Sequence, residues 1–224
     1  MKMVANEGTR IRIGVIDTGV NPWHSHIRGG VTGLRIYLDA AGRIREDDDF
    51  RDLVGHGTAV AGILRQELPD AEIFAVRVFE RDLTSYPSLV ARAVLRAAAE
   101  GCRVLNLSLG MPAGPGAELL AMVCHTVMET GCIIVAAGHP DNEQLLPASI
   151  PGVLGVIADD RVPAGEIRVD HGRCYPYAAS GSPRDLEGVL ENLWGNSFAC
   201  ARVTAHVARH GQDHETDAIA GSSQ

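Results

Sequence analysis

The sequence lacks any long run of apolar residues. Its 224 residues are 46% hydrophobic, yet no stretch approaches the roughly 20 consecutive apolar residues that a membrane-spanning helix needs. The first eight residues also lack the apolar core of a secretory signal peptide. We therefore expect a cytoplasmic protein with no membrane partner.

Basic residues are fewer than acidic ones. The chain has 20 Lys and Arg against 28 Asp and Glu, which gives a formal net charge of −8. Proteins that bind nucleic acids usually carry a basic patch. This balance predicts that the protein has no nucleic-acid partner.

Cysteine and histidine are present without the full ligand set of a metal site. The five cysteines are an odd number, and most of them lie in apolar stretches. This pattern is typical of reduced, buried thiols in a cytosolic protein. His24 and His26 have a ligand-like spacing, but two histidines do not complete a zinc site. We expect neither a metal nor a cofactor.

What the sequence does have is an alternation of apolar runs and helical patterns. This alternation predicts an α/β fold, a three-layer sandwich in which a central, mostly parallel sheet carries helices on both faces. One domain is expected over residues 1–210, followed by a polar tail at 211–224 that is expected to be disordered. The predicted strands are 11–16, 34–38, 72–78, 103–107, 132–136 and 153–157, and the predicted helices are 87–100 and 116–130.

Three polar residues, Asp17, His56 and Ser197, stand beside glycines at expected strand ends or helix starts. Functional residues of parallel sheets gather at the carboxyl ends of the strands. Taken singly, each has an ordinary alternative: a turn aspartate, a turn or cap histidine, and a helix-capping serine. Together they supply a nucleophile, a base that takes its proton and a carboxylate that orients the base.

The order Asp, His, Ser and the segments around these residues resemble the subtilisin family of serine proteases. Residues 17–19 look like the family's Asp motif, and residues 55–62 look like its His motif. Residues 195–199 are similar to its Gly-Thr-Ser-Met-Ala segment around the nucleophile. Residues 104–110 resemble the strand that lines the substrate cleft, and residues 133–138 resemble the strand that leads to the oxyanion hole.

The resemblance implies a subtilisin-like fold and a serine endopeptidase that hydrolyses peptide bonds through an acyl-enzyme. Ser197 would attack the scissile carbonyl. His56 would act as general base and then as general acid, and Asp17 would orient the imidazole and stabilise its charged form. The backbone N–H of Ser197 would donate one hydrogen bond to the oxyanion.

The resemblance also assigns residues to the substrate and oxyanion sites. Ser108, Leu109 and Gly110 would pair with an extended peptide or protein substrate as an added strand. The family normally places an Asn at the oxyanion hole, where this chain has His139. We expect the second oxyanion donor to be His139, or Asn142 reaching back from a reshaped loop; the alternative is that this donor is absent. Loss of one such donor typically lowers the rate by about 10²–10³.

The chain departs from the family in other ways. It is short: the calcium-binding loop that often follows the His helix looks deleted, and only 16 residues precede Asp17. The lack of a pro-domain and signal peptide favours a cytoplasmic enzyme that folds unaided and is restrained by narrow specificity or by a partner. Cleaving a precursor or leader peptide is one such role. Two alternatives stay open: a pseudoenzyme that binds a peptide without turnover, and a protein whose cleft a partner chain completes.

Two further features have structural explanations. Arg202 lies one turn into the helix of Ser197, in a segment where the family usually has Pro-His, and is a candidate for a structural ion pair. The acidic run at residues 46–49 is typical of a solvated loop. The alternative is that this run lies at the cleft rim and favours basic substrate residues.

Overall fold

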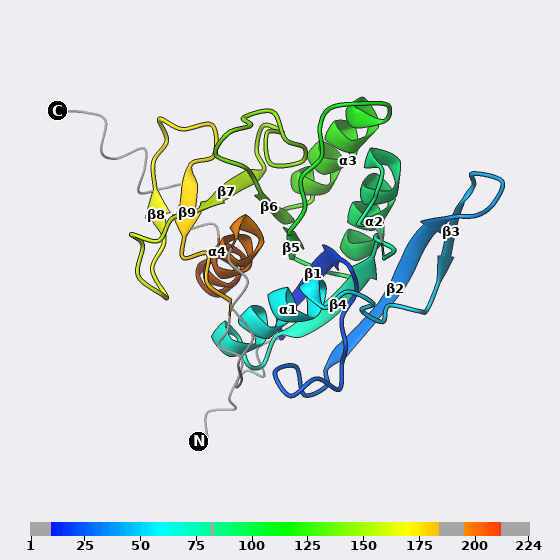
Figure 1. The fold of residues 1–224 in the computed structure, drawn as a ribbon, viewed down its shortest axis with the longest axis horizontal. Helices are drawn as coiled ribbons and strands as arrows, with labels where there is room; N and C mark the ends of the chain where they lie inside the picture. The colour runs from blue at the N-terminus through cyan, green and yellow to red at the C-terminus, as the bar shows by residue number, and fades with distance from the viewer. Residues whose placement is uncertain (1–9, 82, 184–194, 212–224) are drawn as a thin grey trace, which may run out of the picture.

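The computed structural model describes residues 10–81, 83–183 and 195–211 (Figure 1). They form a nine-stranded sheet in the order β3-β2-β4-β1-β5-β6-β7-β9-β8. Only the outer strands β3 and β8 pair antiparallel with their neighbours. The strands are β1 (Arg12–Asp17), β2 (Val31–Leu38), β3 (Ile44–Asp47), β4 (Glu72–Arg77), β5 (Val104–Leu107), β6 (Ile133–Ala137), β7 (Leu154–Ala158), β8 (Arg168–Val169) and β9 (Tyr177–Ala179).

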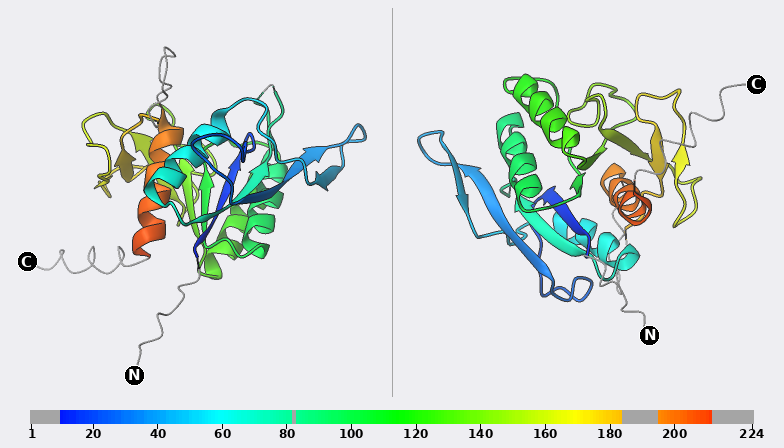
Figure 2. Two further views of the ribbon diagram at one scale, coloured as in Figure 1. Left: turned by 90° about the horizontal axis from the view of Figure 1, so that it is seen from below. Right: turned by 180° about the vertical axis from the view of Figure 1, so that it is seen from behind.

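Helices cover both faces of this sheet, as Figure 2 shows from two further sides. Helices α2 and α3 pack on each other over one face, and α1 and α4 pack on each other over the opposite face. The predicted α/β fold is confirmed. The helices are α1 (His56–Glu67), α2 (Pro87–Ala99), α3 (Ala117–Glu129) and α4 (Asn196–His210).

Strands β3, β8 and β9 were not expected from the sequence. They are two to four residues long, which is too short for a clear alternation of apolar and polar residues. Strand β3 is also largely exposed and rich in charge. It forms the outer strand of the hairpin that extends away from the body at the right of Figure 1.

The parallel register brings the carboxyl ends of four central strands to one edge of the sheet. Asp17 at the end of β1 lies opposite Arg77 at the end of β4. Ile16 lies opposite Leu107 of β5, which in turn lies opposite Ala136 of β6. Residues that follow these strands therefore meet at this edge, where the candidate active site is built.

The remaining expectations about the chain concern its cysteines, its termini and the membrane. All five cysteines are free thiols, and all except Cys174 are buried. Within the described ranges, every helix is too short or too polar to cross a membrane. The expected disordered tail lies outside the described residues, except for Gly211.

Candidate active site

Asp17 ends β1 as a fully buried carboxylate. Its Oδ1 accepts two hydrogen bonds, one from the backbone N–H of Thr18 at 2.6 Å and one from Nδ1 of His56 at 2.8 Å. Its Oδ2 has no hydrogen-bond partner among the described residues. A buried charge needs such donors, so the folded chain holds a carboxylate aimed at the imidazole.

His56 is the first residue of α1, and the glycines around it explain how the helix approaches Asp17 so closely. Gly55 has a φ of 102°, a left-handed conformation that favours glycine. A Cβ at Gly57 would lie 2.2 Å from the carbonyl oxygen of Gly19. Any side chain at position 57 would therefore push α1 away from the Asp17 turn.

The contact with Asp17 fixes the proton arrangement of His56. Because Nδ1 faces a carboxylate, it carries a proton, and in the neutral ring Nε2 is left as the proton acceptor. Burial of the ring is the largest influence on its pKa and lowers it. The charge and hydrogen bond of Asp17, together with the charge of Asp52, outweigh burial, so the pKa of His56 lies above its usual value.

Ser197 is the second residue of α4, at a helix start where the first backbone N–H groups have no partner within the helix. The ring of the next residue, Phe198, lies 6.0 Å from the His56 ring between centroids, so the start of α4 is beside the imidazole. The Ser197 hydroxyl donates to the carbonyl oxygen of Ser108 at 3.2 Å. Among the hydrogen bonds of the described residues, none joins Ser197 to His56. The structure thus brings Asp17 and His56 together and places Ser197 nearby with its hydroxyl turned to Ser108.

The segment predicted to bind substrate follows β5. Ser108 is buried and held from two sides, since its Oγ donates to the Ser197 carbonyl at 3.0 Å and accepts from Nδ2 of Asn106 at 2.8 Å. Leu109 is buried and Gly110 is exposed. In the part of the chain that the structure describes, no backbone hydrogen bond uses the N–H or C=O of Leu109 or Gly110. These groups are free to pair with an extended peptide.

The loop predicted to complete the oxyanion hole follows β6 and closes on itself. His139 Nδ1 accepts from the backbone N–H of Asp141 at 3.2 Å, so the neutral ring carries its proton on Nε2. Asn142 donates its backbone N–H to the His139 carbonyl at 3.0 Å, and its side-chain oxygen accepts from the Gln144 N–H at 3.1 Å. The hydroxyl of Tyr175 anchors the loop by donating to the Asn142 carbonyl at 2.6 Å.

Neither loop side chain forms a hydrogen bond to Ser197 within the described ranges. His139 is half exposed, and its ring has a free Nε2–H donor. The amide nitrogen of Asn142 is likewise uncommitted in the same set of contacts. Both residues therefore stay candidates for the second oxyanion donor.

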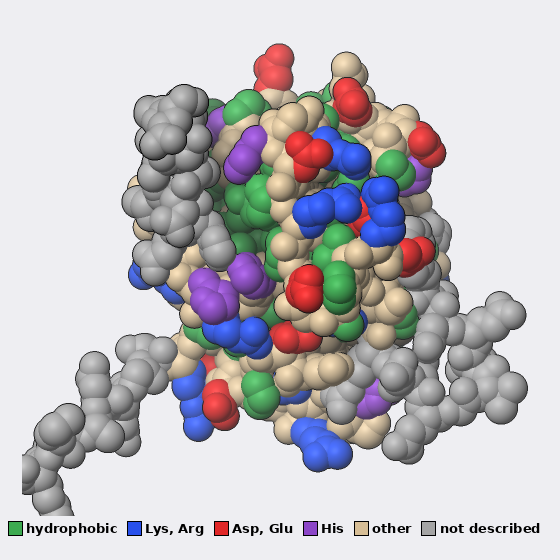
Figure 3. Space-filling view, turned by 90° about the vertical axis from the view of Figure 1, so that its left-hand side faces the viewer, with side chains coloured by type: hydrophobic (Ala, Val, Ile, Leu, Met, Phe, Trp, Pro, Cys, Tyr) green, Lys and Arg blue, Asp and Glu red, His purple; other side chains and the backbone are tan. Residues whose placement is uncertain are grey.

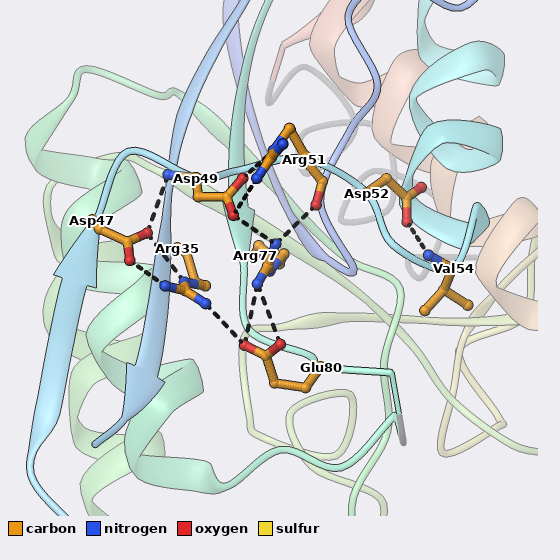
Figure 4. Close-up of polar contacts among 8 residues, drawn as sticks. All are labelled: Arg35, Asp47, Asp49, Arg51, Asp52, Val54, Arg77 and Glu80. Atoms are coloured by element: carbon orange, nitrogen blue, oxygen red, sulfur yellow. Dashed lines mark hydrogen bonds and ion pairs between the residues drawn. The ribbon is translucent and has the colours of Figure 1, made fainter. Parts of the chain in front are cut away.

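The acidic run at residues 46–49 is matched by internal arginines. Figure 4 shows Asp47 against Arg35, and Asp49 against Arg51 and the buried Arg77. The hydrogen bond from Arg51 lowers the pKa of Asp49 to about 2. Of the four, only Asp48 has no side-chain partner among the described residues. Arginines of this chain therefore pair with three of the four carboxylates of the run. The ion pairs of Glu46 are with Arg92 and Arg96.

Arg202 forms the structural ion pair considered from the sequence. It is buried in α4, lies 3.3 Å from the Glu67 carboxylate at the end of α1, and donates to the Ser182 carbonyl at 3.0 Å. The pair joins the helix that carries Ser197 to the helix that carries His56.

Asp52 was missed from the sequence. It lies just before α1, and its carboxylate accepts hydrogen bonds from both the Asp17 turn and the first turn of α1. The available signal was a carboxylate shortly before a helix start, which is typical of a capping residue. The signal is weak in this chain because Asp52 lies three residues before the N-cap residue, Gly55, and close to a run of other acidic residues.

Comparison with known proteins finds a matching family and similar sequences and structures. A model of the subtilase family matches residues 8–219. The thermophilic serine proteinase of Bacillus sp. (strain AK1) is 29% identical in an alignment that covers 88% of this chain, and the chain spans 49% of that relative's length.

Two solved structures share the fold. The prenylagaramide maturation protease PagA superposes with a TM-score of 0.64 at 24% identity, covering 88% of this chain and 73% of that one. The nisin leader peptidase NisP from Lactococcus lactis superposes with a TM-score of 0.68 at 18% identity, covering 89% and 76%.

Proposed function

Because the chain belongs to the subtilase family, we propose that it is a serine endopeptidase that cuts peptide bonds through an acyl-enzyme on Ser197. The observation that carries this proposal is the 2.8 Å hydrogen bond between His56 Nδ1 and the buried Asp17 carboxylate. That bond leaves Nε2 as the only basic atom of the neutral ring. It also supplies a counter-charge for the imidazolium that forms when the ring takes a proton.

In the proposed reaction the Ser197 hydroxyl leaves the Ser108 carbonyl and turns to His56. Catalytic hydrogen bonds are often long or poorly aligned before substrate binds. Oγ attacks the scissile carbonyl while Nε2 takes its proton. Nε2 then returns the proton to the leaving amine. A water molecule next attacks the acyl carbonyl while Nε2 takes its proton, and Nε2 gives that proton to Ser197 Oγ as the acyl group leaves.

The oxyanion is held by the Ser197 N–H at the start of α4, where the helix dipole adds a favourable field. His139 or Asn142 supplies the second donor. The substrate backbone pairs with the free N–H and C=O groups of Leu109 and Gly110, next to the nucleophile.

We further propose that the substrate is a precursor or leader peptide. Two proteins with this fold are, by their names, a maturation protease and a leader peptidase. The free thiols, including the exposed Cys174, suit a reducing compartment such as the cytoplasm.

A second candidate is a partner-dependent or purely peptide-binding role. It is favoured by the Ser197 hydroxyl, which points to Ser108 and not to His56, and by a histidine where relatives carry an oxyanion asparagine.

Incubation with a diverse peptide mixture, read by mass spectrometry, tests the proposal. The wild-type chain is expected to cut a narrow set of peptides and Ser197→Ala to cut none. A folded wild-type chain that cuts nothing, or a Ser197→Ala variant that cuts equally well, would contradict it.

A further inference from the structure

Asp52 collects hydrogen bonds from three separate segments around the Asp17–His56 pair. Its Oδ1 accepts from the Thr18 hydroxyl at 2.9 Å, the Val54 N–H at 2.9 Å and the Gly55 N–H at 2.7 Å. Its Oδ2 accepts from the Thr58 N–H at 2.9 Å and the Thr58 hydroxyl at 2.6 Å. Figure 4 shows this carboxylate at the start of α1, with its bond to Val54. Five donors leave little freedom for the side chain.

The donors adjoin the two residues of the proposed acid–base pair. Thr18 directly follows Asp17, and Gly55 directly precedes His56. The first N–H groups of a helix have no partner within it, and a carboxylate at this end is favoured by both hydrogen bonds and the helix dipole. The N-cap residue of α1, Gly55, has no side chain that could accept a hydrogen bond. Asp52 performs this task from three residues upstream.

Thr18 connects the Asp17 turn and α1 into one chain of hydrogen bonds. Its hydroxyl donates to Asp52 and accepts from the N–H of Gly57 at 2.9 Å. These hydrogen bonds therefore hold Asp17 and His56 at a set separation, because Asp17 precedes Thr18 and His56 precedes Gly57. Resting on the proposed function, we propose that Asp52 is a positioning residue, which holds the Asp17 turn and the His56 helix in register for proton transfer.

The Asp52 charge also acts on His56 through space. Among the described residues, the His56 ring is bonded to Asp17 from β1, feels the charge of Asp52 from the segment before α1, and lies beside the uncharged ring of Phe198 from α4. Both carboxylates favour the imidazolium. Removing the Asp52 charge therefore lowers the pKa of His56, and the acid limb of the pH–rate profile moves to lower pH because the base stays neutral further into acid.

Two substitutions separate the geometric effect from the charge effect. Asp52→Asn removes the charge and turns an NH₂ group toward donors that need an acceptor. Thr18→Val keeps the Asp52 charge but removes the hydroxyl that links the Asp17 turn to α1. Asp48→Asn is the matched control, since it removes a nearby exposed charge that has no side-chain partner in the described part of the chain.

In kinetic assays both Asp52→Asn and Thr18→Val are expected to lower kcat by about 10- to 100-fold with little change in KM, because the reacting groups are misplaced after substrate binds. Only Asp52→Asn is expected to move the acid limb. Asp48→Asn should leave kcat, KM and the profile unchanged. Equal kcat for Asp52→Asn and wild type, or an acid limb that moves equally in Thr18→Val, would overturn the proposal.

A second measurement works without turnover. In a Ser197→Ala background, proton NMR follows the His56 ring titration and its Nδ1 proton, which is hydrogen-bonded to Asp17. Asp52→Asn is expected to lower the His56 pKa and weaken the low-field Nδ1 signal, while thermal unfolding confirms that the variant is folded. An unchanged titration and signal would overturn the positioning role even if the protein were an active protease. The predicted shift in a protein without activity would uphold the role and count against the proposed function alone.

Discussion

The two halves of the proposed active site differ in how firmly hydrogen bonds hold them. In the acid–base half, Asp17 and His56 are already bonded to each other, and Asp52 ties the turn of one to the helix of the other. In the nucleophile half, the Ser197 hydroxyl is engaged with the Ser108 carbonyl. The loop of His139 bonds to itself, to Cys174 and to Tyr175.

The difference follows from burial. A buried carboxylate needs donors within the fold, and Asp17 Oδ1 already has two of them, from Thr18 and His56, before substrate arrives. The nucleophile and oxyanion donors must instead stay available to the reacting carbonyl. In the proposed mechanism, the proton acceptor is therefore pre-organised and the nucleophile is aligned by substrate.

The largest expected effect comes from damage to the acid–base half. Asp17→Asn can present its NH₂ group to Nδ1, which favours the tautomer with the proton on Nε2 and leaves no base for Ser197. We expect kcat to fall by roughly 10⁴-fold, the size of effect that this change has in serine proteases with such a triad. Steady-state kinetics check this, with Asp170→Asn at an exposed loop as the control. A loss below tenfold would mean that the pre-organised pair is not the working base.

The next effect concerns the oxyanion donor in the nucleophile half. One of two substitutions, His139→Ala or Asn142→Ala, is expected to remove this donor. That substitution should lower kcat by about 10²–10³ with little change in KM. The other substitution should have a small effect. If both variants retain full kcat, the second donor lies elsewhere or is absent, and the nucleophile half is less complete than the fold suggests.

The smallest expected effect concerns the ion pair that joins the two halves. Arg202→Met leaves the Ser182 carbonyl without its donor and removes the cation beside Glu67. Breaking this largely buried pair should lower the free energy of unfolding by about 2 kcal/mol, measured by urea denaturation. Arg173→Met, which breaks an exposed pair with Asp170, should cost under about 0.5 kcal/mol. Equal losses would show that Arg202 does not join the helices.

The sequence was informative where periodicity or glycine pattern reflects a strong physical constraint. The buried strand that ends at Asp17 and the glycines on either side of His56 were both recognisable, because core burial and close backbone approach leave few residue choices. The same patterns, together with the resemblance to subtilisins, predict Asp17, His56 and Ser197 as a triad. Their roles remain predictions.

Features set by side-chain direction were not predictable. Asp52 accepts hydrogen bonds from the start of α1 although it lies three residues before the N-cap residue. Its hydrogen bond from Thr18 joins residues 34 positions apart. The acidic run appeared solvated, yet Asp47 and Asp49 meet arginines that arrive from β2 and β4. Neither the pairing partners nor the rotamer of Ser197 is encoded in local composition.

Labelling with a fluorophosphonate tests most directly whether the pre-organised pair activates Ser197. The reagent phosphonylates only an activated serine, and mass spectrometry locates the adduct. We expect one adduct on Ser197 of the wild-type chain, with none in Ser197→Ala and a strongly slowed reaction in His56→Ala. A folded wild-type protein that takes no label, or one that is labelled equally fast without His56, would contradict it.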